Sequence, residues 1–473
     1  MNKKITDRVS NVLLILLPIS LFFSYHPVIT IGTNSTMNLE LSLPEIWLIL
    51  FSLVSVPRIN ALFKFYRKKK LFLASIVPLY LSASIIWSQN RLRTLLTAGL
   101  LWLIVFAVLN LIFRFKMAKL EKKPPFGGIF RIVIFSLLVS AVVMSIYCWV
   151  QCVLDVAGVL RDATLLCRGC VSTAFGFPHP NGFAIEPQFM GNLLIAPVLL
   201  CYYYLCCFDK QNIFTRKSSL ITVTMILSAT LFLTFSRGAI YALVLGFVLE
   251  MIMLKKSKLS KTINVGIVKS LSLIVVAFMV SLVAQGMFAA LGPTNDDFFS
   301  GISKSIHQLT LGKIDLRDNS QAPAEQLSTE TEQTEQSFPQ KQSDFSGYVA
   351  ESTNRRLDLN KYAFETWKSN PQYLWIGAGL GSAGKAMNQL FPDKVGVKEI
   401  VQNEYYSLLL ETGLVGSGLI LLVAVITIKS LKKSKTSPLF ASVIFSYLLT
   451  LMFFSGLPNA LQIYLLPVLI FFV

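Results

Sequence analysis

The chain has 473 residues, a mean hydropathy of +0.61 and only 14% charged residues. This composition excludes an ordinary water-soluble protein, because apolar runs of roughly twenty residues recur along it. The net charge of +18 comes largely from short basic clusters between apolar runs, at 58–70, 114–123, 255–261 and 429–435. Alternating basic loops are typical of the cytoplasmic side of membrane proteins, so the charge does not indicate nucleic-acid binding.

The apolar runs predict an all-α polytopic membrane protein with both termini cytoplasmic. The first run follows Lys3, Lys4 and Arg8 but lacks a small-residue cleavage site, so we expect a retained span rather than a signal peptide. Twelve spans are predicted, at 12–25, 44–62, 71–87, 94–113, 130–154, 188–208, 220–235, 239–254, 265–290, 405–428, 438–454 and 460–473. They divide the chain into 1–290, an extracytoplasmic segment at 291–404, and 405–473.

The outer loop at 155–187 contains the sequence FGFPHPNG at 175–182. Two prolines and two glycines this close exclude a continuous helix. His179 within this turn is a candidate base near neutral pH, and Glu186 at the membrane edge is a second candidate. The alternative for His179 is a structural role in the turn. The alternative for Glu186 is a solvated surface charge.

Metal and cofactor sites are not expected. Cys167 and Cys170 lie in the outer loop, where a disulfide is one option, but a zinc site would need two further ligands and none are suitably spaced. Asp296 and Asp297 lack a further acidic group arranged for a divalent cation. We therefore predict neither a metal nor a cofactor.

Arg237 lies between two apolar runs, where the chain reverses at an outer turn. An arginine costs about 2.5–3.5 kcal/mol at the centre of a membrane helix and less near the interface. Membrane topology does not favour positive charge on the outer side. The position therefore predicts a cation that faces a cavity and binds an anion, with snorkelling to lipid headgroups as the alternative.

The outer segment has two parts. Residues 318–347 are polar and almost without large apolar residues, so we predict disorder there. Residues 355–404 have a helical pattern that Asn370-Pro371 ends, followed by a glycine-rich turn, and we expect them to dock on the bundle. Arg355 and Arg356 stand at the start of this part. Because guanidinium groups match phosphate oxygens, the two arginines are candidates for binding a phosphate group. The alternative is that they are solvated charges at the start of a helix.

Gln402, Asn403 and Glu404 stand where the chain re-enters the membrane. Their amides and carboxylate are suited to sugar hydroxyls, and the carboxylate can accept a proton. A solvated charge at a helix start is the alternative for Glu404. Gly413 and Gly416 follow in the next apolar run and predict close helix packing.

Outward arginines beside polar residues at the membrane surface fit a polyprenyl-diphosphate-linked glycan. The lipid would lie among the spans, and fixed guanidinium groups would stabilise the charge of the departing diphosphate without a metal. A base would remove a proton from the acceptor hydroxyl, and displacement in one step would invert the anomeric centre.

Several short motifs occur in one order along the chain. They are Thr234-Phe235-Ser236-Arg237-Gly238, the Arg356-Leu357 start of a helix with Trp367, Pro371 with Gly377-x-Gly379-x-Gly381, and Asn403 followed by nine residues and Gly413-x-x-Gly416. In this order the chain resembles the O-antigen ligase and polymerase superfamily of bacterial membrane glycosyltransferases. The resemblance covers roughly residues 175–423.

The resemblance implies a helical bundle of the GT-C type in the bacterial cytoplasmic membrane. It also implies that Arg237 and Arg356 bind a donor diphosphate, with a glycan or lipid carrier as acceptor. In the ligase branch a proposed catalytic histidine precedes the Asn403-type position, where this chain has Gln402. Glutamine does not accept a proton at ordinary pH, so the base is left open among Glu404, Glu186 and His179.

Two other classes of function remain open. A lipid-glycan flippase or transporter would need charged residues through the depth of the spans, whereas the charges of this chain cluster outside them. A non-catalytic glycolipid-binding protein would be consistent with Gln402 at the position of the histidine.

Overall fold

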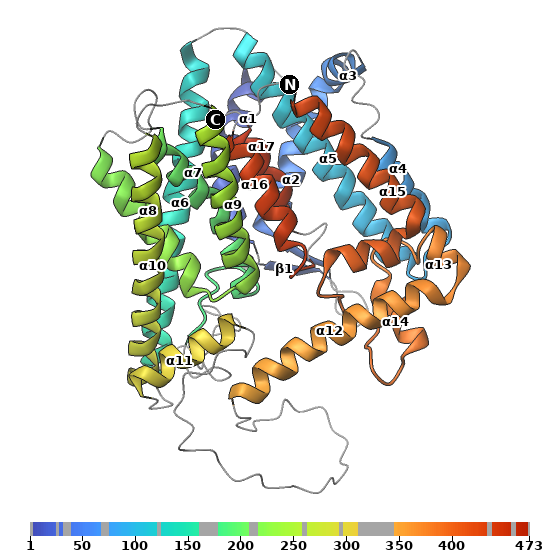
Figure 1. Cartoon of the computed structure of the whole chain (residues 1–473). Coiled ribbons are helices and arrows are strands. Elements are labelled where there is room, and N and C mark those ends of the chain that lie inside the picture. Colours follow the sequence, from blue (N-terminus) through green and yellow to red (C-terminus); the bar gives the residue numbers. More distant parts are fainter. Residues whose placement is uncertain are drawn as a thin grey trace, which may run out of the picture.

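The computed structural model describes residues 3–24, 28–31, 39–67, 75–120, 124–159, 178–207, 216–257, 263–292, 297–310, 345–432, 438–455 and 460–471. Helices dominate these residues, which confirms an all-α polytopic protein (Figure 1). One exception was not predicted: β1 (Val28–Ile31) pairs antiparallel with β2 (Leu39–Ser42) between the first two predicted spans. Cys167 and Cys170 lie outside the described residues.

The helices of the bundle overlap the predicted spans, although two helices share the span predicted at 44–62 and the last four residues of the span predicted at 438–454 are not helical. They are α1 (Lys3–Phe22), α2 (Leu43–Ser55), α3 (Ile59–Arg67), α4 (Ile76–Ala83), α5 (Arg91–Leu120), α6 (Pro124–Val156), α7 (Pro187–Cys206), α8 (Lys217–Leu233), α9 (Arg237–Ser257), α10 (Ile263–Leu291), α15 (Glu404–Lys432), α16 (Pro438–Thr450) and α17 (Leu461–Ile470). Among the described residues, seven helical stretches are long and apolar enough to cross a membrane, and four shorter apolar helices accompany them. The count of twelve spans stays a prediction.

Helix α7 lies at the centre of the bundle and is buried along nearly its whole length. It contacts α8, α9, α10, α16 and α17. Gly191 allows α9 to approach closely, because a Cβ atom at Gly191 would lie 2.8 Å from Cβ of Ala239 and 3.1 Å from Cβ of Ser236. This contact fixes the start of α9, where Arg237 stands.

The segment 291–404, predicted to be extracytoplasmic, contributes a layer of helices at one end of the bundle. It comprises α11 (Phe298–Leu309), α12 (Phe345–Ser369), α13 (Pro371–Trp375) and α14 (Ala383–Leu390). The start of α1 and the end of α17 lie at the opposite end (Figure 1). Of the stretch predicted to be disordered, 318–344 lies outside the described residues, whereas 345–347 begin α12. The amphipathic helix α11 was not predicted.

Asn370 ends α12 as the sequence predicts. Its side-chain oxygen accepts a hydrogen bond from the backbone N–H of Gln372 at 2.8 Å and so caps α13. Proline at the first position of α13 fits because that position needs no N–H donor. The chain then turns back toward α15 through the glycine-rich stretch.

The glycine-rich turn pairs with α15 through its backbone. Ala378 N–H donates to the carbonyl of Leu410 at 2.9 Å, and Gly379 N–H donates to that of Glu411 at 3.0 Å. These carbonyls are available because α15 is interrupted at Gly413, whose φ of 62° and ψ of −170° are not helical. Gly413 therefore breaks the helix, while Gly416 provides the expected close packing, since a Cβ atom there would lie 2.5 Å from Tyr80 Cε1.

Replacing Gly413 by alanine is expected to destabilise the protein. This backbone conformation costs a residue with a side chain roughly 1–3 kcal/mol. A Cβ atom would also lie 2.5 Å from the backbone of Trp375. Gly418→Ala is the matched control, because a Cβ atom there would meet nothing within 4 Å. Thermal unfolding in detergent should show a lower midpoint for the first variant alone; equal midpoints would contradict the role assigned to Gly413.

Candidate functional site

Arg237 stands at a tight turn between α8 and α9. Phe235 has a φ of 47°, the left-handed region that side-chain-bearing residues rarely adopt. Ser236 N–H donates to Oγ1 of Thr234 at 3.3 Å, and Ala239 N–H donates to Oγ of Ser236 at 3.4 Å. Strained residues of this kind persist only when surrounding contacts hold them, and they cluster at functional sites. The turn places Arg237 on the first position of α9.

The side chain of Arg237 is half-buried and lies near a second arginine. Its Nη1 atom is buried and has no hydrogen-bond partner among the described residues. Arg356 on α12 is close enough to repel it electrostatically and is itself half-buried. Two guanidinium groups held near each other, one with a buried unpaired donor, form a site that an anion with several oxygens would stabilise.

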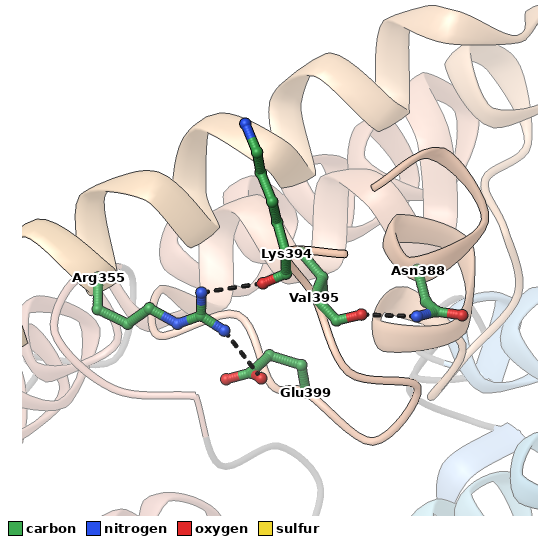
Figure 2. A network of polar contacts seen from close by, with 5 residues as sticks. All are labelled: Arg355, Asn388, Lys394, Val395 and Glu399. Carbon is green, nitrogen blue, oxygen red and sulfur yellow. Dashed lines mark hydrogen bonds and ion pairs between the residues drawn. The ribbon is translucent and has the colours of Figure 1, made fainter. Parts of the chain in front are cut away.

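Arg355 is engaged elsewhere. Its Nη1 donates to the carbonyl of Lys394 at 2.9 Å, and its Nη2 pairs with Oε2 of Glu399 at 3.2 Å (Figure 2). Consecutive residues on a helix point about 100° apart. Arg355 therefore ties the loop after α14 to α12, while Arg356 points from a different side of the helix. The structure brings Arg356, and not Arg355, together with Arg237.

Glu404 is the first residue of α15 and is buried. Its N–H donates to the carbonyl of Leu451 at 2.9 Å, and its carboxylate Oε2 accepts a hydrogen bond from Oγ of Ser455 at 3.0 Å. Asn403 caps the helix through Oδ1, which accepts from Tyr405 N–H at 3.0 Å. Gln402 is half-buried directly before the cap. The carboxylate of Glu404 is thus fixed in place rather than solvated.

The segment 451–455, after α16, connects the separate parts of the site. Besides contacting Glu404, it contributes Phe453, whose Cβ would lie 2.9 Å from a Cβ atom added at Gly238. The carbonyl of Phe453 also accepts from Nε2 of Gln188 at 2.8 Å, two residues after the exposed Glu186. The starts of α7, α9 and α15 therefore meet around one short segment. No motif in the sequence marked it.

A family model described as O-antigen ligase matches residues 222–421. The resemblance to the O-antigen ligase superfamily is confirmed. The matched segment contains Arg237, Arg356 and Glu404, whereas His179, Glu186 and the segment 451–455 lie outside it. No curated protein and no solved structure matches the chain. The match indicates a glycosyltransferase-like enzyme in a membrane context with lipid-linked glycans.

His179 supports the turn that carries Arg237, in the segment that the family model matches. Its ring packs edge-on against Phe235 with centroids 6.0 Å apart, and it is buried. Burial lowers the pKa of His179 to about 3, although a hydrogen bond with the backbone of Thr234 opposes the shift. The imidazole is therefore neutral at ordinary pH and holds a proton poorly. This disfavours the predicted role of His179 as a base near neutral pH.

The buried His179 predicts a loss of stability in acid. Unfolding restores its ordinary pKa of 6.5, so between pH 6.5 and about 3 the unfolded chain binds the extra proton and stability falls as pH falls. This one group can contribute at most about 1.4 kcal/mol per pH unit. Glutamine cannot titrate in this range. The midpoint of thermal unfolding of His179→Gln should therefore fall less between pH 7 and pH 4 than that of the unmodified protein, each taken relative to its own midpoint at pH 7. Parallel curves for the two proteins would contradict the buried neutral state.

Glu411 is a buried acid that sequence reasoning missed. Its Oε1 accepts a hydrogen bond from the N–H of Ala383, at the start of α14, at 3.3 Å. The first N–H groups of a helix lack helical partners, and the side chain of Glu411 satisfies one of them. Glu411 thus fastens the outer layer to α15 seven residues after Glu404. A carboxylate inside the apolar run 405–428 was the signal that could have revealed it.

Proposed function

We propose that this protein transfers a glycan from a polyprenyl diphosphate donor to a saccharide or envelope acceptor. The reaction takes place on the outer face of the bacterial cytoplasmic membrane, at the end of the bundle covered by α11–α14. The observation that carries the proposal is the half-buried Arg237, whose Nη1 has no partner among the described residues and which lies within electrostatic range of Arg356. Tyr241, one turn after Arg237, donates a hydrogen bond to the carbonyl of Leu309 at the end of α11, consistent with this side.

The two arginines bind the diphosphate and stabilise its departure. As the bond between the anomeric carbon and the diphosphate oxygen breaks, the electron pair moves onto the diphosphate and its negative charge grows. Guanidinium groups that are already in place stabilise this charge without reorganising. Their positive charge supplies what a metal ion would otherwise supply, so the proposed reaction is independent of metal.

Glu404 serves as the general base in this proposal. An acceptor hydroxyl attacks the anomeric carbon from the face opposite the diphosphate and gives its proton to the Glu404 carboxylate, which inverts that centre. The hydrogen bond from Ser455 holds the carboxylate, and the cap at Asn403 holds the helix start. Gln402 cannot take the proton, so its role in this proposal is to bind a sugar hydroxyl through its amide. Glu186, exposed at the start of α7, is the alternative base.

The neighbouring arginines of α12 provide the test. Arg356→Ala is expected to lower transfer by roughly tenfold to a hundredfold, since hydrogen bonds to charged groups contribute about 1.5–3 kcal/mol. Arg355→Ala is the matched control. It breaks an exposed pair with Glu399 that contributes no more than about 1 kcal/mol to folding, so transfer should stay near that of the unmodified protein. Transfer is measured in membranes with lipid-linked glycan as donor. Unchanged transfer by a folded Arg356→Ala protein would overturn the proposal for this residue.

A further inference from the structure

Arg356 begins a line of half-buried side chains on α12. Asn360 and Phe364 follow at intervals of four residues, so the three lie along one side of the helix over about 12 Å. Their side chains flank the buried face formed by Leu359 and Ala363. Their side chains are partly exposed rather than buried in the core. Side chains that line a binding surface have this intermediate exposure.

Asn360 brings an unsatisfied amide to this line. Its Oδ1 atom is buried and has no hydrogen-bond partner among the described residues. A buried acceptor without a donor costs roughly 1–3 kcal/mol. The side chain as a whole is half-buried, and the terminal torsion of asparagine is soft, so a rotation presents either amide atom to a ligand. A sugar hydroxyl group can donate to the amide oxygen or accept from the NH₂, so it pairs with whichever atom is presented.

Tyr406 adds an open aromatic ring at the far end of the line. It lies in the first turn of α15, and 37% of its surface is exposed. Phe364 supports it edge-on with ring centroids 6.2 Å apart. Phe364 itself is enclosed by Trp367, at 5.4 Å between ring centroids, and by Nζ of Lys368, at 4.1 Å from its ring centroid. The free face at this end therefore belongs to Tyr406.

We propose that Asn360 and Tyr406, supported by Phe364, form a saccharide subsite that extends from Arg356. A few placed polar groups beside an aromatic surface are the usual way in which proteins orient small polar ligands. The glycan leaves the diphosphate at Arg356, meets the amide one turn along α12 and lies against the ring of Tyr406. The inference rests on the proposed function, because Arg356 is the end shared by the diphosphate and saccharide sites.

Binding of two lipids to the purified full-length protein tests the subsite. The probes are sugar-free polyprenyl diphosphate and the lipid-linked glycan extracted from cells that lack this protein. Asn360→Ala and Tyr406→Ala should each weaken binding of the glycan-bearing lipid by about five- to tenfold and leave the sugar-free lipid unaffected. Tyr406→Phe keeps the ring and should bind both lipids normally. Lys361→Ala, on the exposed side of the same helix, should also bind both normally.

Two outcomes would overturn the subsite. In one, Asn360→Ala and Tyr406→Ala bind the glycan-bearing lipid as the unmodified protein does. In the other, they lose both lipids equally, which indicates a role in packing. Failure of the proposed function would look different, because Arg356→Ala would then keep full affinity for sugar-free polyprenyl diphosphate. The contrast between Tyr406→Ala and Tyr406→Phe decides the result even if Asn360→Ala folds poorly.

Discussion

Replacing Arg237 by alanine is expected to lower glycan transfer by about 10²–10³-fold, the loss typical of removing one donor that stabilises charge in a transition state. The physical reason is the position of its guanidinium, half-buried with an unpaired Nη1 beside Arg356. Within such a partly dry site, the attraction to a diphosphate is stronger than it would be in water. Transfer is measured in membranes at saturating donor, with protein amount and thermal unfolding checked in parallel.

Arg237→Lys separates charge from geometry. Lysine keeps the positive charge but cannot form the planar two-pronged contact with phosphate oxygens, so activity should fall between those of the arginine and alanine proteins. Arg216→Ala is the control, because Arg216 is exposed and precedes α8 at the end of that helix away from Arg237. Full activity of a folded Arg237→Ala protein would remove the diphosphate site, whereas loss in the Arg216 variant would indicate a general effect of charge.

Local features of the site could be predicted from the sequence. The depth of Arg237 between two apolar runs, the end of α12 at Asn370-Pro371 and the close packing at Gly416 each follow from residues near one another in the chain. Hydrophobic periodicity and turn chemistry act over a few residues, so a single sequence reports them. The same information predicted a helix in each of the twelve apolar runs.

The joining of separate elements could not be predicted in this way. Residue type and helical pattern do not distinguish Arg355 from Arg356, and only the family resemblance singled out Arg356. In the structure Arg355 holds the loop at Glu399, and Arg356 lies near Arg237. Which side of α12 meets which neighbour depends on packing between distant segments, and no local pattern encodes it. The contact of segment 451–455 with Glu404 is of the same kind. Gly413 packs closely against the backbone of Trp375, as the sequence predicts, but the break in α15 at this residue was not predicted, because a glycine in an apolar run is compatible with both an intact and a broken helix.

Replacing Glu404 by glutamine is expected to lower the catalytic rate by roughly 10²–10⁴-fold while donor binding stays unchanged. The amide keeps the shape of the side chain and an oxygen for the hydrogen bond from Ser455, so the loss isolates the ability to accept a proton. The measurement is the transfer rate at saturating donor and acceptor, together with the affinity for sugar-free polyprenyl diphosphate.

The three candidate bases can be ranked by the same substitution. Glu186→Gln alters an exposed carboxylate at the start of α7, and His179→Gln alters a neutral, buried imidazole, so neither should reduce transfer as Glu404→Gln does. Glu404 would be rejected if its glutamine variant remained active while the Glu186 variant lost activity. The base would then act from the start of α7 rather than from the start of α15.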